Sequence, residues 1–434
     1  MMRIAPAAAE IRDPIHGYIY PTELEKSVID TPVFQRLRRI RQLAGAHLTY
    51  PGGQHSRFEH LVGAMHLAGK ACETLAERTS FSVDDVRELR LAGLLHDVGH
   101  GPYSHLFEEV MSERRNVTHE DMTVRIIRET ELRDILSAHG IDAVDFSPLA
   151  IGLSERKPRF MNDVIGGGLS IDTMDYLLRD SYFTGVEYGK VDVHRIIDAY
   201  EVADSRLALD RAALYAFEAL MIARYEMFRA VYFHRTVRSA ELMLVRAMTL
   251  ADDTLGLTDL RDLEKYLYLT DEVALASLID LDPAGNSQLK RARELAISYR
   301  DRRLLKCVFE EIVQRKDRLF DRIFSQRSIR DQIANEMAKE ADVDAEEVYV
   351  DVPTTPSVPL TSARQTLSEI TLVSKSNGES KYETLGLDQL PLVNAISGYM
   401  DILRVYTTED NREKVEKAAK SFFATDGFAT RISM

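Results

Sequence analysis

Several features that would place this chain in other classes are scarce in its sequence. It has two cysteines in 434 residues, Cys72 and Cys307, too few and too far apart for a disulfide framework or a cysteine-type zinc site. No apolar stretch approaches the roughly 18 residues of a membrane-spanning helix. The N-terminal segment MMRIAPAAAEIRDP becomes charged too early for a signal peptide. We therefore expect a cytoplasmic protein with no membrane span.

An excess of positive charge is also missing. The chain has 55 Lys and Arg against 69 Asp and Glu, which gives a formal net charge of −14. Broad nucleic-acid binding needs a basic face, so no strong nucleic-acid binding is expected. A small anionic ligand needs only a local basic pocket, and that class of ligand stays open. The sequence shows no internal repeat and no low-complexity tract.

Helical periodicity dominates the first 250 residues. In DTPVFQRLRRIRQLAG, Thr31 can cap a helix, Pro32 suits its first position and Gly45 can end it. Further helices are predicted near residues 60–78, 84–97, 118–138, 170–183, 193–201, 211–233 and 235–251. The region 258–342, including DRRLLKCVFEEIVQR, also has a helical pattern.

The pattern changes after residue 343. EVYVDVP alternates like a strand, PTTPSVP is a proline-rich loop, and ITLVSKSNGESKYETL predicts a hairpin that turns at Asn377-Gly378. VEKAAKSFF predicts a last helix. The fold class is therefore mainly α, with a helical-bundle core over residues 1–250 and a C-terminal α+β lobe over residues 251–434.

Eight of the twelve histidines lie between His47 and His119. His96 and Asp97 are adjacent, so they converge on one ion only if the helix ends there and DVGHGP turns the backbone. A single histidine or His-Asp pair is more often structural. Together with His60 upstream and a remote aspartate downstream, however, the pair makes a mixed ligand set. Such a set suits Mn, Fe, Zn or Mg ions, which can turn a bound water into a nucleophile.

Four motifs carry a family resemblance: RFEHLVGAMHLAG, LLHDVGHGPYSH, THED and IDTMDYLLRDSYFTG. In order and spacing they resemble the motifs of the HD-domain phosphohydrolases. The closest likeness is to deoxynucleoside triphosphate triphosphohydrolases of the SAM-and-HD-domain type, without the SAM domain, and it is strongest over residues 11–245. It implies an HD-domain core and a divalent metal ion (Mn, Mg, Fe, Zn or Ni). The ligands it implies are His60, His96, Asp97 and Asp172.

The same resemblance implies catalytic roles for four residues. His100, His105 and His119 would surround the α-phosphate of the substrate. His105, oriented by Glu108, would be the general acid that protonates the departing 5′-oxygen, a step suited to a histidine beside a carboxylate. The alternative for His105 is a structural residue at the start of a helix, bonded to backbone.

Substrate-binding residues also follow from the resemblance. Leu43 would crowd the 2′ position of the sugar and so exclude ribose. The alternatives are a surface ion pair for Arg224 and core packing for Tyr232. The full substrate-binding set implied is Gln42, Leu43, Arg57, Tyr176, Asp180, Arg224 and Tyr232.

A regulatory site is the last implication. Asp30, Gln35 and Arg38 match residues that read guanine in the nucleotide-activated tetramers of the family, although Asp30 can equally cap a helix and Arg38 can be solvated. Some positions depart from the family pattern, namely Arg12, Asp210, Ala212 and Ala216. The activator could thus be GTP, dGTP, another nucleotide or none, and a homo-oligomer, dimer or tetramer, is expected.

Three functions compete at this point. The first is hydrolysis of a dNTP to deoxynucleoside and triphosphate. The second is an HD-domain phosphatase or phosphodiesterase acting on a monophosphate, a ribonucleotide or a cyclic nucleotide. The third is a nucleotide-sensing regulator with little turnover.

Overall fold

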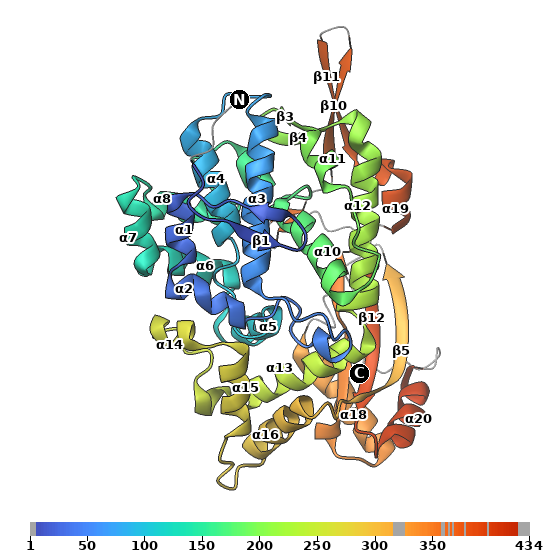
Figure 1. The fold of residues 1–434 in the computed structure, drawn as a ribbon. Coiled ribbons are helices and arrows are strands. Elements are labelled where there is room, and N and C mark those ends of the chain that lie inside the picture. Colours follow the sequence, from blue (N-terminus) through green and yellow to red (C-terminus); the bar gives the residue numbers. More distant parts are fainter. Residues whose placement is uncertain are drawn as a thin grey trace.

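The computed structural model describes residues 6–315, 326–356, 361–362, 365–366, 369–376, 379–396 and 399–423. Helices from the first two thirds of the chain form the body, and β5 and β12 run along one side of it (Figure 1). The described helices are α1 (Glu23–Ile29), α2 (Pro32–Gln35), α3 (Arg57–Leu75), α4 (Val83–Leu95), α5 (His105–Arg115), α6 (His119–Glu129), α7 (Glu131–Ala138), α8 (Ala143–Ala150), α9 (Arg159–Gly166), α10 (Ile171–Thr184), α11 (Val193–Asp198), α12 (Leu214–Met227), α13 (Arg235–Leu255), α14 (Leu263–Tyr268), α15 (Asp271–Ile279), α16 (Ser287–Arg300), α18 (Arg327–Ala341), α19 (Pro391–Ile396) and α20 (Arg412–Phe423).

Short strands complete the architecture. β10 pairs in parallel with β4, so the β10–β11 hairpin extends the β3–β4 hairpin, while β12 pairs with β5, β6 and β7. The described strands are β1 (Ile11–Asp13), β2 (Gly17–Ile19), β3 (Tyr200–Ala203), β4 (Arg206–Asp210), β5 (Lys306–Arg315), β6 (Val348–Asp351), β7 (Thr354–Pro356), β8 (Thr361–Ser362), β9 (Gln365–Thr366), β10 (Glu369–Ser376), β11 (Glu379–Gly386) and β12 (Tyr399–Thr407).

Helix α3 lies at the centre of the main core. Ser56 and Glu59 form a capping box at its start, and buried residues occupy most of its length, as expected for a helix with most of its surface in the core. A Cβ atom at Gly93 of α4 would lie 3.1 Å from the carbonyl oxygen of Ala64 and 3.0 Å from Ile171 Cδ1. Glycine at this position therefore permits the close approach of α3, α4 and α10.

A second, smaller core lies in the C-terminal part. Apolar residues of α18 and α20 pack against Val308, Val350 and Val405 of the β5–β12–β6 sheet. Helix α13 continues through residue 250 to Leu255, so the predicted division at residue 250 falls inside a helix. That division stays a prediction. No helix in the described part of the chain combines the length and apolar character that a membrane span requires.

The mainly α fold class is confirmed, and most predicted elements are present. Thr31 caps α2 with Pro32 at its start, and α3, α4, α10, α13 and α20 lie within a few residues of their expected positions. Strand β6 and the two antiparallel hairpin strands β10 and β11 are also confirmed. The predicted Asn377-Gly378 turn lies outside the described residues, as does 357–359 of the proline-rich loop.

Other boundaries were wrong. The helix expected to reach Gly45 ends after Arg39, because the Ile40 carbonyl accepts from Arg57 N at 2.9 Å and the chain turns extended. The helix predicted over 118–138 is broken at Thr130, which caps α7. Residues 306–315, predicted as helix, form strand β5 along β12. Strands β1, β2, β3, β4, β7, β8, β9 and β12 were not predicted, and β7 lies in the segment predicted as a proline-rich loop. The helix predicted over 211–233 begins later, at Leu214.

A buried ion pair ties α1 to α4 and generates the first prediction. Glu25 accepts from Arg90 Nε at 2.6 Å and Nη2 at 2.7 Å, and also from the backbone of Thr22 at 2.8 Å. Glu25→Ala leaves Arg90 buried without its counter-ion, so the free energy of unfolding should fall by about 3–5 kcal/mol in urea titration. Glu73→Ala, which removes an exposed pair with Lys70, is the matched control and should change stability little. Equal stabilities for the two variants would contradict this account.

Candidate metal-centred active site

Four predicted ligands converge where three helices meet. His60 lies in the first turn of α3, His96 and Asp97 directly follow α4, and Asp172 lies in the first turn of α10. From His60 Nε2 the distances are 3.3 Å to His96 Nε2, 3.8 Å to Asp97 Oδ2 and 3.2 Å to Asp172 Oδ1. His96 Nε2 lies 3.7 Å from Asp97 Oδ2 and 3.6 Å from Asp172 Oδ1.

These spacings fit the ligand shell of one divalent ion. Ligand bonds of about 2.1 Å put neighbouring ligand atoms about 3–3.4 Å apart, close to the observed separations. His96 Nδ1 lies 3.0 Å from the Gly93 carbonyl, which can only accept, so Nδ1 carries the proton and Nε2 is free to bind the ion. Burial raises the pKa of Asp97, but His96, His100 and Arg57 lower it by more. The pKa of this carboxyl therefore lies well below its usual range. The cluster thus offers two imidazoles and two carboxylates.

The turn after Asp97 is held by side chains from distant parts of the chain. Arg36 Nη2 donates to the His100 carbonyl at 2.6 Å, and the Tyr266 hydroxyl donates to the Gly99 carbonyl at 2.5 Å. A Cβ atom at Gly99 would lie 2.1 Å from the His119 carbonyl. The glycine expected to turn the backbone is therefore required there by close backbone contact.

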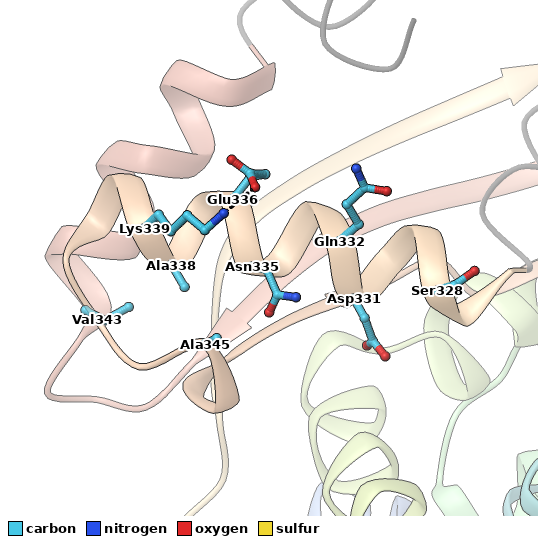
Figure 2. Close-up of a pocket in the computed structure, with 9 residues that line it drawn as sticks. All are labelled: Ser328, Asp331, Gln332, Asn335, Glu336, Ala338, Lys339, Val343 and Ala345. Atoms are coloured by element: carbon cyan, nitrogen blue, oxygen red, sulfur yellow. Dashed lines mark hydrogen bonds and ion pairs between the residues drawn. The ribbon is translucent and has the colours of Figure 1, made fainter. Parts of the chain in front are cut away.

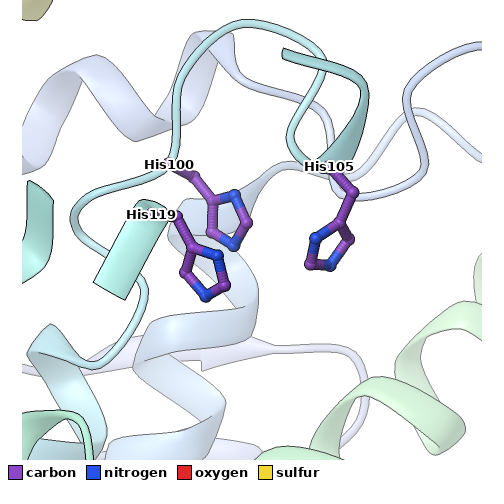
Figure 3. Close-up of side chains that lie close together, drawn as sticks. All are labelled: His100, His105 and His119. Atoms are coloured by element: carbon purple, nitrogen blue, oxygen red, sulfur yellow. The ribbon is translucent and has the colours of Figure 1, made fainter. Parts of the chain in front are cut away.

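Three further histidines, His100, His105 and His119, lie close together (Figure 3), and two of them approach Asp97 of the cluster. One ring nitrogen of each lies within 4.8 Å of the other two. The rings of His100 and His119 are stacked, 4.0 Å apart with an angle of 13°, and His105 meets them edge-on. Parallel rings cannot aim two lone pairs at one ion. The arrangement therefore suits hydrogen bonds to an anion better than a second metal ion.

Glu108 holds two of these histidines. Its Oε2 lies 3.0 Å from His105 Nδ1, and its Oε1 lies 2.6 Å from His119 Nδ1. Burial raises the pKa of Glu108, but His105 and His119 lower it by more. The pKa of this carboxyl therefore lies well below its usual range. Burial lowers the pKa of His119, but Glu108 raises it overall. Burial, Arg57 and His119 lower the pKa of His100 well below its usual range.

A cavity of about 760 Å³ opens onto the cluster, within the usual range of small-molecule sites. His60 and His100 lie behind its wall, 0% and 1% exposed. Of the predicted site residues, the wall contains Gln42, Leu43, Arg57, His96, Asp97, His105, Glu108, His119, Asp172, Tyr176, Asp180, Arg224 and Tyr232. The structure thus brings the predicted metal, catalytic and substrate residues to one cavity.

Polar contacts fix the cavity wall. Arg57 pairs with Asp97 and donates to Ser104 Oγ at 2.8 Å. Arg224 donates to the Tyr176 hydroxyl. Around Asp180, the Tyr232 hydroxyl donates to Oδ2 at 2.7 Å, and Oδ1 accepts from His55 Nε2 at 2.7 Å (Tyr232 is thus more than core packing).

The three predicted regulatory residues lie apart from this site. Asp30, Gln35 and Arg38 line a second cavity of about 460 Å³, which also contains Arg12 and Lys26. The Arg38 guanidinium lies 3.4 Å from the centroid of the Phe58 ring and donates to Gln35 at 2.8 Å. Asp30 is the C-cap residue of α1 and pairs with Lys26. Asp30 thus caps α1 through its backbone N–H only, and the side chain that caps the next helix, α2, is that of Thr31.

A third hollow, of about 360 Å³, lies on α18 (Figure 2). Its polar side chains include Asp331, Asn335 and an exposed Glu336–Lys339 pair 2.7 Å apart. None of the predicted site residues lies there.

The sequence analysis missed several residues that build the site. Arg36 and His55 lie in segments it examined, but their partners, a backbone carbonyl and Asp180, are set by the fold. Arg238 and Glu241 line the main cavity from α13. In IDTMDYLLRD, Asp175 and Arg179 follow Asp172 at helical spacing, and this signal could have pointed to both residues.

Comparison with known proteins agrees with this geometry. The HD domain family matches residues 57–159, and the HD associated region matches residues 191–432. The chain therefore belongs to the HD-domain family, whose domains are metal-dependent, and its His/Asp cluster could hold a divalent ion.

Particular relatives narrow the likeness. The chain is 31% identical over 346 residues to the deoxynucleoside triphosphate triphosphohydrolase SAMHD1 homolog of Dictyostelium discoideum, covering 76% of this chain and 64% of that protein. It is 31% identical over 348 residues to the Homo sapiens protein SAMHD1 of the same description (69% and 55%). An uncharacterised Bacillus subtilis protein is 35% identical over 240 residues (55% and 54%). The chain thus spans about half to two thirds of these relatives.

A solved structure covers nearly the whole chain. The crystal structure of a hypothetical protein from Aquifex aeolicus matches with a TM-score of 0.74 and 29% identity, over 95% of this chain and 100% of that one. The similarity therefore extends through the C-terminal lobe.

Glu241 generates a prediction on pH. Burial raises its pKa to about 7, although Arg238, which donates to it at 2.7 Å, lowers it. Because the folded protein holds this proton more tightly than the unfolded chain, stability should fall as pH rises from about 4.5 to about 7. Glu241→Gln keeps an acceptor for Arg238 and removes the ionisation. Relative to wild type, it should gain on the order of 3 kcal/mol between pH 4.5 and pH 8 in urea titrations. Parallel stability curves for the two proteins would contradict the assignment; Glu155→Gln, at an exposed position, should give such a parallel curve.

Proposed function

We propose that this protein is a dNTP triphosphohydrolase, which converts a dNTP and water into a deoxynucleoside and triphosphate. The observation that carries the proposal is the single cavity that joins the four-ligand cluster to the His105–Glu108 pair and to Arg57 and Arg224. The named relatives of this description support the same reaction.

The proposed metal ligands are His60, His96, Asp97 and Asp172. A divalent ion held by these side chains would stabilise charge on the α-phosphate and make a water acidic enough to act as nucleophile. The chain's own residues account for the remaining requirements.

The proposed catalytic residues act on the phosphate and the leaving group. His100 and His119 bind the α-phosphate oxygens by hydrogen bonds. His105 donates a proton from Nε2 to the departing 5′-oxygen, since Glu108 occupies its Nδ1. Arg57 and Arg224 neutralise the phosphate chain.

The proposed specificity residues contact the sugar. Leu43 crowds the 2′ position beside Gln42. Asp180 accepts from the sugar hydroxyl, with Tyr176 and Tyr232 packed against the ring; Asp180 is already oriented by His55 and Tyr232. This set supports a deoxynucleotide over a ribonucleotide.

A guanine nucleotide is the proposed ligand of the second cavity. Asp30 can accept from the N1–H and N2 donors of guanine, and Arg38 can donate to its O6 and N7 acceptors. Gln35 holds Arg38 in place at 2.8 Å. The proposal includes a homo-oligomer, dimer or tetramer, as the active form.

Product analysis tests the reaction. The purified protein with Mn²⁺ or Mg²⁺ and each dNTP should yield deoxynucleoside and intact triphosphate by liquid chromatography and mass spectrometry. Asp97→Ala should keep the circular dichroism spectrum of the wild type and lose turnover, because one ligand and the partner of Arg57 are removed.

Controls separate the alternatives. Asp163→Asn, which alters a pair with Arg206 outside the cavity, should keep turnover. The proposal would be contradicted by any of three results: orthophosphate and dNDP as products, turnover only on other nucleotides, or an active Asp97→Ala protein. If GTP stimulates turnover and Asp30→Ala abolishes that stimulation, the second cavity is supported as a regulatory site. Equal rates with and without GTP would contradict that role.

Leu43 generates a separate prediction on the sugar. Leu43→Ala opens space at the 2′ position, so kcat/KM for ATP relative to dATP should rise about tenfold or more. Steady-state kinetics with both nucleotides measure the ratio. Leu392→Ala, on the exposed side of α19, should leave it unchanged. An unchanged ratio in Leu43→Ala would mean that another group selects the sugar.

A further inference from the structure

A buried carboxylate that is not one of the four proposed metal ligands contacts one of them, His60. Asp175 on α10 is 0% exposed. Its Oδ2 lies 2.8 Å from His60 Nδ1, and its Oδ1 lies 2.7 Å from His16 Nε2. Arg179 donates to both oxygens, from Nε at 2.8 Å and Nη2 at 2.9 Å. Asp175 is therefore fully occupied by donors, one of which is a proposed metal ligand.

The N-terminal motif DPIHG closes this network. Asp13 Oδ1 accepts from the backbone nitrogens of Ile15 at 2.9 Å and His16 at 2.8 Å, which fixes the turn that carries His16. Asp13 Oδ2 accepts from Arg179 Nη1 at 2.8 Å. Asp13 and Arg179 are 4% and 0% exposed. The motif therefore anchors Asp175 from two sides.

Close packing leaves Asp175 no other position. A Cβ atom at Gly63 of α3 would lie 2.0 Å from Asp175 Oδ1 and 2.3 Å from Arg179 Nη2. The carboxylate thus fills the space that Gly63 leaves open. A buried carboxylate is costly without a paired cation, and Arg179 supplies one.

We propose that Asp175 is a positioning residue of the metal centre, which fixes the ring orientation and tautomer of His60 and is itself fixed by His16 and by the Arg179–Asp13 pair. A carboxylate can only accept, so His60 carries its proton on Nδ1 and its Nε2 lone pair faces the other ligands. His96 has only a backbone carbonyl in the same position. Of these two proposed ligands, only His60 is therefore held by a carboxylate.

This proposal rests on the assignment of His60 as a ligand, which belongs to the proposed function. A purely structural Asp175 would join α10 to α3 and affect stability alone. The two roles separate in the binding of the metal itself, which needs no substrate and no turnover.

The decisive experiment titrates the full-length, metal-depleted protein with Mn²⁺ by calorimetry. Asp175→Asn keeps the shape but no longer presents two carboxylate oxygens, so its Mn²⁺ affinity should fall about 10–100-fold. Asp163→Asn is the matched control, since it alters a partly buried carboxylate, 2.8 Å from Arg206 and outside the cluster, and should bind Mn²⁺ like wild type. A folded Asp175→Asn protein with wild-type affinity would overturn the proposal.

Two further variants distinguish a failed ligand assignment from a failed positioning role. His60→Ala should lose Mn²⁺ binding; unchanged binding there would refute the ligand assignment rather than the positioning role. If Asp175→Asn does not fold, His16→Gln leaves the Asp175–Arg179 pair intact and decides the question. It should weaken Mn²⁺ about threefold and shift the visible absorption of the Co²⁺-loaded protein. Wild-type affinity and spectrum in that variant would overturn the proposal.

Discussion

The close approach of α3, α4 and α10 is the constraint on which the site depends. The facing side-chain atoms of the proposed ligands, which lie in or directly after three separate helices, are 3.2–3.8 Å apart, so small helix shifts would open the cluster. Gly93 has no side chain at the point where α4 contacts α3 and α10. The space beside Gly63 is filled by the carboxylate of Asp175. The same packing that forms the core therefore sets the ligand geometry.

Charge is arranged around that constraint at short range. The chain is acidic overall, yet Arg57, Arg224 and Arg238 line the main cavity together with Asp97 and Asp172. Arg57 pairs directly with Asp97, so an arginine of the cavity wall is joined to the four-residue cluster. A local balance of this kind admits an anion into an acidic protein without a basic surface.

The sequence predicted what short motifs and helical spacing can carry. His96, Asp97 and their glycine-rich turn were readable, because the helix end and the turn are local. Strand β5 was not, because Cys307–Phe309 joins a sheet only through β12, about a hundred residues later. The early end of the helix at Ile40 likewise depends on Arg57 and Ser56. Non-local hydrogen bonds, which no local pattern encodes, overrode propensity in both places.

The C-terminal lobe contacts the wall of the same cavity, and Arg238 shows how. Arg238 of α13 lines the cavity, donates to Glu241 beside it, and donates to both oxygens of Asp351 on β6 at 2.8 and 3.1 Å. The cavity wall is therefore held partly from the lobe. Helix α13, which carries Arg238 and Glu241, runs unbroken to Leu255. It therefore crosses the predicted boundary at residue 250 between the core and the C-terminal lobe. A catalytic core cut at residue 250 would lose the partner that orients Arg238, so the lobe contributes to the shape of the site as well as to the fold.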